Sequence, residues 1–356
     1  MNDFRKTLND CLQEFEFNQI EIGPLKTPLT ISFYQDWLEQ NYFGSMNYLK
    51  EHLELKRNPQ GLNENLKSVI SIAQAYYPAV APPPEKNPAR VALYSQNNDY
   101  HHWLKVKLQQ FIEKLKALYP DEIFLPYVDS GPVLERNWAY ENQLGWFGKN
   151  TCLIHPQFGS LFFIAEILTS KATQTELKLQ PLPDFCGKCQ KCIEICPTQA
   201  LIEPRKMKAD LCISYLTIES KEVPPLELRA KMQDWFFGCD LCQTVCPWNE
   251  KFFRQKEIES SNDLSIDRQL NLDPDEKKNL IEYFRWLLAA SHNQIQKKNL
   301  GSALARAGAK GLKRNALIVI ANRGLIELKD DVQNLELTEL EELKNWTLQQ
   351  LLQKQC

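Results

Sequence analysis

The sequence lacks the segments that direct proteins into or across membranes. Its N-terminus, residues 1–6, continues into a polar stretch with Glu14 and Glu16, so the apolar core of a signal peptide is missing. The most apolar run, residues 161–168, contains Glu166 and is far shorter than the roughly 20 residues that a membrane-spanning helix needs. We therefore expect a cytoplasmic protein with no membrane partner.

The sequence also has little net charge. Its 42 Lys and Arg residues nearly balance its 45 Asp and Glu residues, which gives a net charge of -3. This balance argues against the uniformly basic surface of a general nucleic-acid binder, although local basic patches remain possible. The composition is 43% hydrophobic and 24% charged, as in ordinary globular proteins. A chain of 356 residues is long enough for two domains and a small third.

The first 180 residues predict a mixture of helices and strands. Leucine, isoleucine and phenylalanine recur at helical spacing over residues 104–118, and Pro120 follows this predicted helix. Short apolar and β-branched runs predict strands at residues 68–77, 91–94 and 160–168.

Prolines and composition changes divide the chain. Residues 78–88 contain five prolines and predict a surface loop, because proline fixes φ and removes a backbone donor. A second proline-containing stretch, residues 180–184, predicts a domain boundary. Residues 275–353 show helical periodicity and almost no strand signal, so we expect an all-helical C-terminal region.

The eleven cysteines carry the strongest functional signal. In a reducing compartment, cysteines in spaced runs are better explained as metal ligands than as disulfides. The run Cys186-x2-Cys189-x2-Cys192-x3-Cys196-Pro is typical of bacterial ferredoxins, in which three thiolates hold one cubane cluster and the fourth holds another. A second run, Cys239-x2-Cys242-x3-Cys246-Pro, is one cysteine short, and Cys212 lies upstream to complete the number.

These eight cysteines predict two 4Fe-4S clusters with exchanged fourth ligands. The first set is Cys186, Cys189, Cys192 and Cys246, and the second is Cys196, Cys212, Cys239 and Cys242. A pair of zinc sites is the alternative, because C-x2-C pairs also bind zinc, but two runs that each end in Cys-Pro favour iron and sulfide. Such clusters relay single electrons and perform no bond chemistry on a substrate. Since the chain has domain-sized segments on both sides, we expect it to consume the electrons itself.

Several segments in order resemble the epoxyqueuosine reductases, a cobalamin-dependent family related to reductive dehalogenases. The resemblance covers nearly the whole chain and rests on five segments: residues 127–136 (YVDSGPVLER), 145–151 (GWFGKNT), 185–189 (FCGKC), 212–219 (CISYLTIE) and 237–249 (FGCDLCQTVCPWN).

The resemblance implies an α+β fold in three parts. Residues 1–180 would form a nitroreductase-like, cobalamin-binding catalytic domain, residues 181–255 a ferredoxin-like domain with two 4Fe-4S clusters, and residues 275–356 a HEAT-like helical tRNA-binding domain. It also implies that epoxyqueuosine at the wobble position of tRNA is reduced with two electrons and two protons, with loss of water. An external low-potential donor would supply the electrons, and we expect a monomer.

The resemblance also assigns roles to particular residues. Asp129 matches the family's proton donor, and opening an epoxide leaves an alkoxide that a carboxylic acid can protonate; without the family, Asp-Ser-Gly-Pro predicts a turn. The residues expected at or near cobalamin are Arg57, Tyr100, His101, Asp129, Lys149, Asn150, Ser214 and Tyr215. For these, solvated charge, helix capping by Asn150 and core packing of Tyr215 are the alternatives.

A basic segment of the C-terminal region resembles the helices with which the family binds tRNA. No Asp or Glu occurs in residues 297–323, and cations there can bind phosphates. The predicted contacts are Lys297, Lys298, Arg306, Lys310, Lys313 and Arg314. A solvated helix face is the alternative for the charges. For the whole chain, the alternatives are a reductive dehalogenase-like enzyme for a small molecule and an electron-transfer module.

Overall fold

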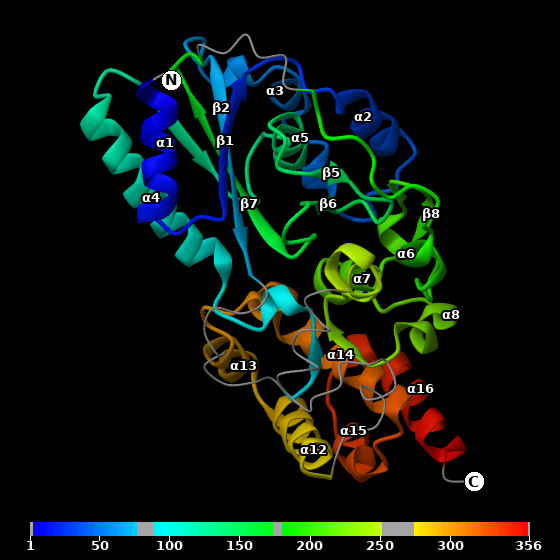
Figure 1. The fold of residues 1–356 in the computed structure, drawn as a ribbon. Helices are drawn as coiled ribbons and strands as arrows, with labels where there is room; N and C mark the ends of the chain where they lie inside the picture. The colour runs from blue at the N-terminus through cyan, green and yellow to red at the C-terminus, as the bar shows by residue number, and fades with distance from the viewer. Residues whose placement is uncertain (1–2, 77–87, 174–179, 251–273, 355–356) are drawn as a thin grey trace.

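The computed structural model describes residues 3–76, 88–173, 180–250 and 274–354 (Figure 1). Most of the proline-containing segment expected to form a loop lies outside these residues. None of the helices in the described part of the chain combines the length and the low polarity that crossing a bilayer would require.

A four-stranded antiparallel sheet organises the N-terminal half. Its strands, in spatial order, are β1 (Gln19–Pro24), β2 (Ser68–Ala75), β7 (Phe162–Thr169) and β4 (Phe124–Tyr127). The strands predicted at 68–77 and 160–168 are confirmed as β2 and β7 within two residues at the ends that the structure describes. Nearly every residue of these two central strands is buried, which explains their continuous apolar sequence.

Helices cover both faces of this sheet. Helices α1 (Asp3–Glu14) and α4 (Tyr100–Leu118) pack on one face against Ile70 and Ile72, which alternate with residues of the other face. Helix α5 (Glu135–Glu141) covers the other face. The helix predicted over 104–118 is therefore confirmed, and it begins four residues earlier, because the Asp99 side chain accepts a hydrogen bond from the backbone of His101.

One strand prediction was wrong in extent. Residues 91–94 were expected to be a strand, but β3 spans only Arg90–Val91 and is followed by a 3-10 helix, Leu93–Ser95. The Ser95 hydroxyl donates to the Ala92 carbonyl and the Leu93 amide donates to Asp240, so these polar groups are satisfied by a turn. The strand β3 pairs in parallel with β10 (Trp235–Phe237).

Short elements make up the cysteine-bearing region and the connections. The helices are α2 (Ile31–Glu39), α3 (Leu53–Arg57), α6 (Lys191–Glu194), α7 (Ile213–Ile218), α8 (Leu226–Arg229) and α9 (Leu241–Thr244). The remaining strands are β5 (Trp146–Phe147), β6 (Leu153–Ile154), β8 (Leu201–Glu203) and β9 (Lys206–Met207), paired as β5 with β6 and β8 with β9. The other 3-10 helices span Asn47–Leu49, Pro59–Leu62, Ala209–Leu211, Ala230–Met232, Ala303–Ala307, Ile326–Leu328 and Thr338–Leu340.

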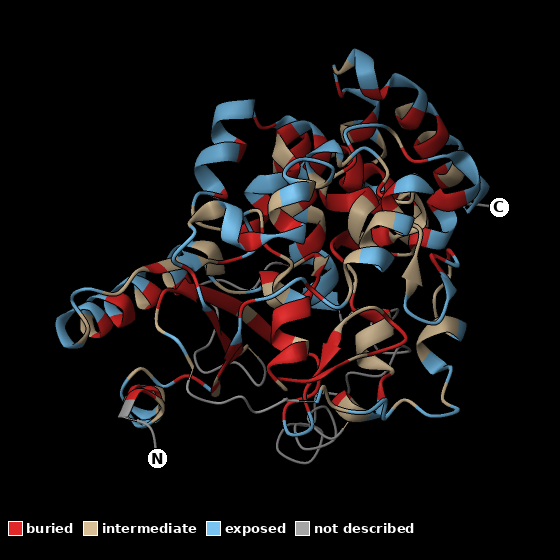
Figure 2. Cartoon of the chain, turned by 90° about the horizontal axis from the view of Figure 1, so that it is seen from above, coloured by how far each residue is buried: buried red, intermediate tan, exposed pale blue. Residues whose placement is uncertain are grey.

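The C-terminal region is helical throughout its described residues, as predicted. Its helices are α12 (Pro274–Ala289), α13 (His292–Lys298), α14 (Gly308–Arg323), α15 (Lys329–Gln333) and α16 (Glu341–Gln353). Helix α14 is the central one: it contacts α12, α13 and α16, and it also packs on β10. Its sides are buried almost all round, while the outer faces of the surrounding helices are exposed (Figure 2).

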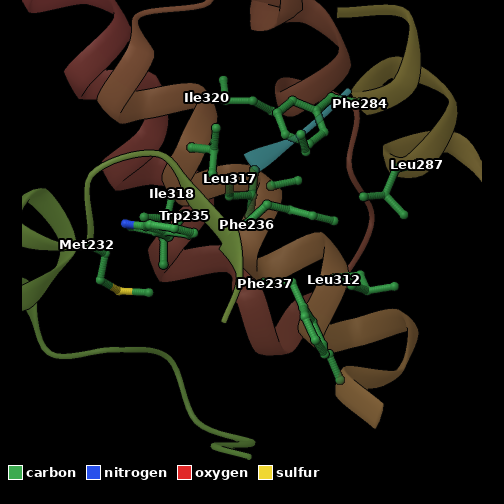
Figure 3. Packing of buried hydrophobic residues seen from close by; sticks show 14 of the residues in the cluster. Met232, Trp235, Phe236, Phe237, Phe284, Leu287, Leu312, Leu317, Ile318 and Ile320 are labelled. Carbon is green, nitrogen blue, oxygen red and sulfur yellow. The ribbon is translucent and has the colours of Figure 1, made fainter. Parts of the chain in front are cut away.

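One hydrophobic core joins the C-terminal helices to the cysteine-bearing region. Phe236 and Phe237 of β10 lie against Leu312 and Leu317 of α14 and Phe284 of α12 (Figure 3). The same core includes residues of α7 and α9, which flank three of the cysteines. The helices therefore help to hold the polypeptide around those cysteines in place.

Candidate active site and cysteine centres

The eight spaced cysteines are all free thiols in the structure, and their effects on one another's pKa values divide them into two sets. In the first set, burial raises the pKa of Cys192 to about 11, and the neighbouring Cys246, Cys186 and Cys189 add to this rise. Burial also raises the pKa of Cys246, and the neighbouring Cys186 and Cys189 make smaller contributions to this rise. These effects link the four thiols of the first set electrostatically.

The second set is formed by Cys196, Cys212, Cys239 and Cys242. Burial raises the pKa of Cys212, with a contribution from Cys196, and burial together with Cys212 raises the pKa of Cys239 and Cys242. Backbone N–H groups also reach these sulfur atoms. The amide of Ala200 lies 3.3 Å from Cys196 Sγ, and those of Ser214 and Tyr215 donate to Cys212. Such donors suit sulfur atoms that carry the negative charge of a cluster.

Lys149 and Asn150, which were predicted at cobalamin, reach the cysteine loops with their side chains. Lys149 Nζ donates to the carbonyls of Gly187, at 2.7 Å, and Cys189, at 2.8 Å. Asn150 Nδ2 donates to the carbonyl of Cys242 at 3.1 Å. Both side chains are buried. The turn after β5 therefore connects the sheet region to both sets of cysteines.

Asp129 belongs to a chain of hydrogen-bonded acid and base groups. Its Oδ2 lies 2.9 Å from Nε2 of His101, whose Nδ1 lies 2.7 Å from Oδ1 of Asp99. Asp129 follows β4, whereas His101 is in the first turn of α4 and Asp99 caps that helix. The Asp129 side chain is 49% exposed and faces solvent, whereas the side chains of His101 and Asp99 are more enclosed.

The pKa values of the neighbouring groups are shifted by this arrangement. The hydrogen bond to Asp129 is the main reason that the pKa of His101 is raised. Burial, followed by the charge of Asp129, raises the pKa of Tyr100 well above its usual value. Burial, again with Asp129, raises the pKa of Glu135 to about 8. Groups with shifted pKa values around an exposed carboxylate are typical of a site that transfers protons.

Glu135 also fixes the backbone of Asp129. Asp129 has φ of 56°, a left-handed conformation that is uncommon for residues other than glycine. Its amide donates to Glu135 Oε1 at 2.6 Å. Sequence reasoning identified neither Glu135 nor Asp99 as a site residue. The position of Asp99 before an apolar periodic helix was a recognisable capping signal, but its bond to His101 depends on the folded loop.

A second group of polar side chains lies near Asp129. Arg306 Nε donates to Glu219 Oε1 at 2.5 Å, and its Nη2 lies 3.5 Å from the Tyr48 hydroxyl. Burial raises the pKa of Tyr48, and the charges of Glu219 and Asp129 contribute. Three distant parts of the chain therefore meet at one site. The backbone completes this junction, because the amide of Asp99 donates to the carbonyl of Gly301 at 2.8 Å.

Other predicted cofactor residues have varied surroundings. Tyr100 stacks on Phe163, with ring centroids 4.0 Å apart. The Tyr215 hydroxyl accepts a hydrogen bond from the Ser45 amide at 2.8 Å, and Ser214, the residue before it, is half-buried beside Cys212. Arg57 pairs loosely with Glu54 at 3.9 Å, and no hydrogen bond joins it to the Asp129 group among the described residues.

The residues predicted to contact tRNA differ in how far they are exposed to solvent. Lys297, Lys298 and Lys310 are exposed, and Arg306 is exposed beside the Asp129 site. Lys313 is half-buried, and its ammonium donates to the carbonyl of Leu288 at 2.9 Å. These positions leave the outer lysines available to a charged partner.

The prediction for Arg314 was wrong. Its residue surface is 1% exposed. Its guanidinium donates to the carbonyls of Ser220, Glu222 and Leu216 and to Asn315. A run of charged residues on a helix does not show which side chain points inward. The Arg314 side chain does so, and its hydrogen bonds connect α14 to α7 and the segment that follows it.

Eight cysteines in runs with ferredoxin spacing are typical of an iron–sulfur oxidoreductase. A family model described as 4Fe-4S double cluster binding domain matches residues 185–249, and a model described as Epoxyqueuosine reductase QueG matches residues 56–130. Among curated relatives, epoxyqueuosine reductase of Leadbetterella byssophila is 37% identical over 283 residues, which cover 80% of this chain and 87% of the relative. The epoxyqueuosine reductase of Escherichia coli K12 is 34% identical over 326 residues, which cover 90% of this chain and 82% of the relative. The chain belongs to the epoxyqueuosine reductase family, and its double-cluster domain binds two 4Fe-4S clusters.

Solved structures agree over nearly the full length. An epoxyqueuosine reductase crystallised with an epoxyqueuosine-modified stem loop of tRNA-Tyr has a TM-score of 0.78 at 25% identity, covering 98% of this chain and 90% of that one. An epoxyqueuosine reductase from Bacillus subtilis, described with its catalytic loop swung out of the active site, has a TM-score of 0.77 at 25% identity, covering 98% and 91%. The mixed helix and sheet fold is thus confirmed.

Proposed function

We propose that this protein reduces epoxyqueuosine to queuosine at the wobble position of tRNA, with electrons that pass from two 4Fe-4S clusters to cobalamin. Membership of the epoxyqueuosine reductase family supports the reaction. The hydrogen-bonded chain from Asp99 through His101 to Asp129 carries the proposal for the catalytic site, because the reaction needs a proton donor at the opened epoxide.

Asp129 is the proposed catalytic acid. His101 bonds to one carboxylate oxygen of Asp129, and Asp99 orients the ring of His101 through its other nitrogen. The raised pKa of His101 favours its protonated form, which can return a proton to Asp129 after each turnover. Glu135 holds the Asp129 loop from behind. The Bacillus subtilis relative has a catalytic loop that leaves its active site, which supports a role for this contact.

The proposed ligands of the first cluster are Cys186, Cys189, Cys192 and Cys246, and those of the second are Cys196, Cys212, Cys239 and Cys242. The mutual effects of the thiols within each set support this division.

Cobalamin, when bound, would supply the cobalt that delivers electrons to the substrate. Polar and aromatic groups from three parts of the chain, including Tyr48, Asp129 and Arg306, meet at one site and suit a large polar ligand. The proposed contacts are Arg57, Tyr100, His101, Asp129, Lys149, Asn150, Ser214 and Tyr215. For Lys149 and Asn150 this leaves the backbone of their turn, because the side chains are bonded elsewhere.

The tRNA would contact the basic residues of the C-terminal region. The relative that holds a modified tRNA stem loop supports this partner. Lys297, Lys298, Arg306, Lys310 and Lys313 are the proposed phosphate contacts, with the last held partly by α12. The proposal also includes a nitroreductase-like domain in residues 1–180, a ferredoxin-like domain in 181–255 and a HEAT-like domain in 275–356. The protein would act as a cytoplasmic monomer with an external low-potential donor.

The test is a reduction assay with an epoxyqueuosine-containing tRNA stem loop. Protein reconstituted anaerobically with iron, sulfide and cobalamin is given a chemical reductant, and the nucleosides are analysed by mass spectrometry. We expect queuosine to form only when cobalamin and clusters are both present. Reduction of a halogenated small molecule without activity on the stem loop would instead identify a dehalogenase-like enzyme, and cluster reduction without either product would identify an electron-transfer module.

A further inference from the structure

A buried cation lies beside the first set of cysteines. Lys149 is 9% exposed, and its ammonium contacts the carbonyls of Gly187 and Cys189 within the first cysteine run. No carboxylate pairs with this ammonium in the part of the chain that the structure describes. A buried charge is costly unless an opposite charge compensates it. The fold alone therefore leaves the cation of Lys149 without a counter-charge.

A 4Fe-4S cluster held by four thiolates would provide this counter-charge, because such a cluster is anionic. When the cluster accepts one electron, it gains one further unit of negative charge. A fixed cation stabilises the reduced cluster more than the oxidised cluster, and low solvent exposure strengthens the interaction. Net charge, hydrogen bonds and solvent exposure are the means by which a protein sets a cluster's reduction potential.

We infer that Lys149 raises the reduction potential of the cluster held by Cys186, Cys189, Cys192 and Cys246, and so eases the uptake of each electron there. The other cluster lacks this effect from the same turn. Asn150 offers it a neutral amide, which donates to the carbonyl of Cys242. Adjacent residues thus contact both cysteine loops, but only one brings a charge. The inference rests on the ligand sets of the proposed function and not on the tRNA reaction.

The experiment is a reductive titration of the full, cluster-loaded protein, followed by electron paramagnetic resonance. The key variant is Lys149→Met, which keeps an unbranched side chain only one atom shorter and removes its charge. One of the two reduction steps should become about tenfold less favourable, which is about 59 mV more negative for a one-electron couple. The other step should move much less. Lys149→Arg should remain close to the parent protein.

Lys188 provides the matched control. It is next to Cys189 in the chain, but it is exposed, so solvent and salt should screen its charge. Lys188→Met removes the same formal charge and should move neither step by more than about twofold. Equal shifts in the two methionine variants, or no shift in Lys149→Met, would overturn the inference.

Iron and sulfide analysis covers the case in which Lys149→Met does not retain its clusters. Lys149→Gln, which keeps an N–H donor without the charge, is then compared with Lys149→Arg. Cluster loss in both neutral variants with retention in the arginine variant supports charge compensation. Cluster loss in all three overturns it, because shape alone would explain the requirement. Since these measurements use no tRNA, they are independent of whether epoxyqueuosine is the substrate.

Discussion

The sheet region and the cysteine-bearing region are stabilised by different kinds of core. In the sheet region, separate hydrophobic clusters lie on the two faces of one sheet, and all of their residues come from the first half of the chain. The segments around the second set of cysteines instead share a cluster with the C-terminal helices, in which Phe236 packs near Phe284, whereas Cys246 of the first set packs with Trp146 and Ile154. The helices are thus part of the support for the second set of cysteines, in addition to their proposed role at tRNA.

The proposed chemistry follows the same division. Asp129 and His101 belong to the sheet region, and the electron-carrying cysteines belong to the other. The two regions meet, among other contacts, where Lys149 and Asn150 reach the cysteine loops. The Asp99 amide also bonds to Gly301 of the C-terminal region. Substitutions in one region alone can therefore test whether the proton-transfer residues and the cluster ligands are structurally separate.

The largest effect should come from Asp129→Asn. Loss of the carboxylic acid should lower the rate of epoxyqueuosine reduction by a hundredfold or more, because general acid catalysis contributes about 10² to 10⁴ in rate. Iron, sulfide and the visible spectrum of the clusters should be unchanged, since no hydrogen bond joins Asp129 to the eight proposed ligands, all of which the structure describes. A variant that loses its clusters together with its activity would contradict the separation of the two regions.

Two core substitutions of similar cost, one in each region, should differ in their effect on the retention of cluster iron. Phe284→Ala and Phe111→Ala each remove a fully buried phenyl ring and should cost about 3–5 kcal/mol. Only Phe284→Ala should accelerate the loss of cluster iron to a chelator, because Phe284 lies in the core that supports β10 and α7. Equal rates of iron loss in the two variants would show that the cores are not independent.

Substitution of a buried cation of α14 should lower stability, whereas substitution of an exposed one should weaken tRNA binding. Arg314→Met leaves several buried carbonyls without a donor and should lower the free energy of unfolding by about 3 kcal/mol. Lys310→Met should change it by less than about 0.5 kcal/mol. The lysine variant should instead weaken binding of a tRNA stem loop and reduce the salt dependence of that binding. Unchanged binding would remove Lys310 from the proposed interface.

A pH effect should be the smallest. The pKa of Glu135 is raised to about 8 from 4.5, so its contribution to stability is fully present below about pH 4.5 and is lost as pH rises through about 8. Glu135→Gln keeps an oxygen for the Asp129 amide but has no proton to lose. Thermal unfolding at several pH values should show that the parent loses roughly 1–3 kcal/mol more than the variant between about pH 5 and 9. Parallel curves would exclude this shift.

Local patterns explain why much of the fold could be predicted. Helix α4 and the strands β2 and β7 were foreseeable because apolar periodicity reports which side of an element is buried. The short strand β3 was overestimated, since a few apolar residues cannot distinguish a strand from a turn whose amides bond to a distant carboxylate such as Asp240. The strand order and the shared core depend on contacts between remote segments, which periodicity does not encode.

The sequence by itself determined the cysteine runs and the family, and it singled out Asp129 as the proposed catalytic acid, because these are properties of short segments. Tertiary structure decided the surroundings of each charged group. It placed His101 between two carboxylates, buried Arg314 under carbonyl groups and directed Lys149 towards a cysteine loop. The physical reason is that burial and pairing determine what a charge does, and both arise only when distant segments pack together.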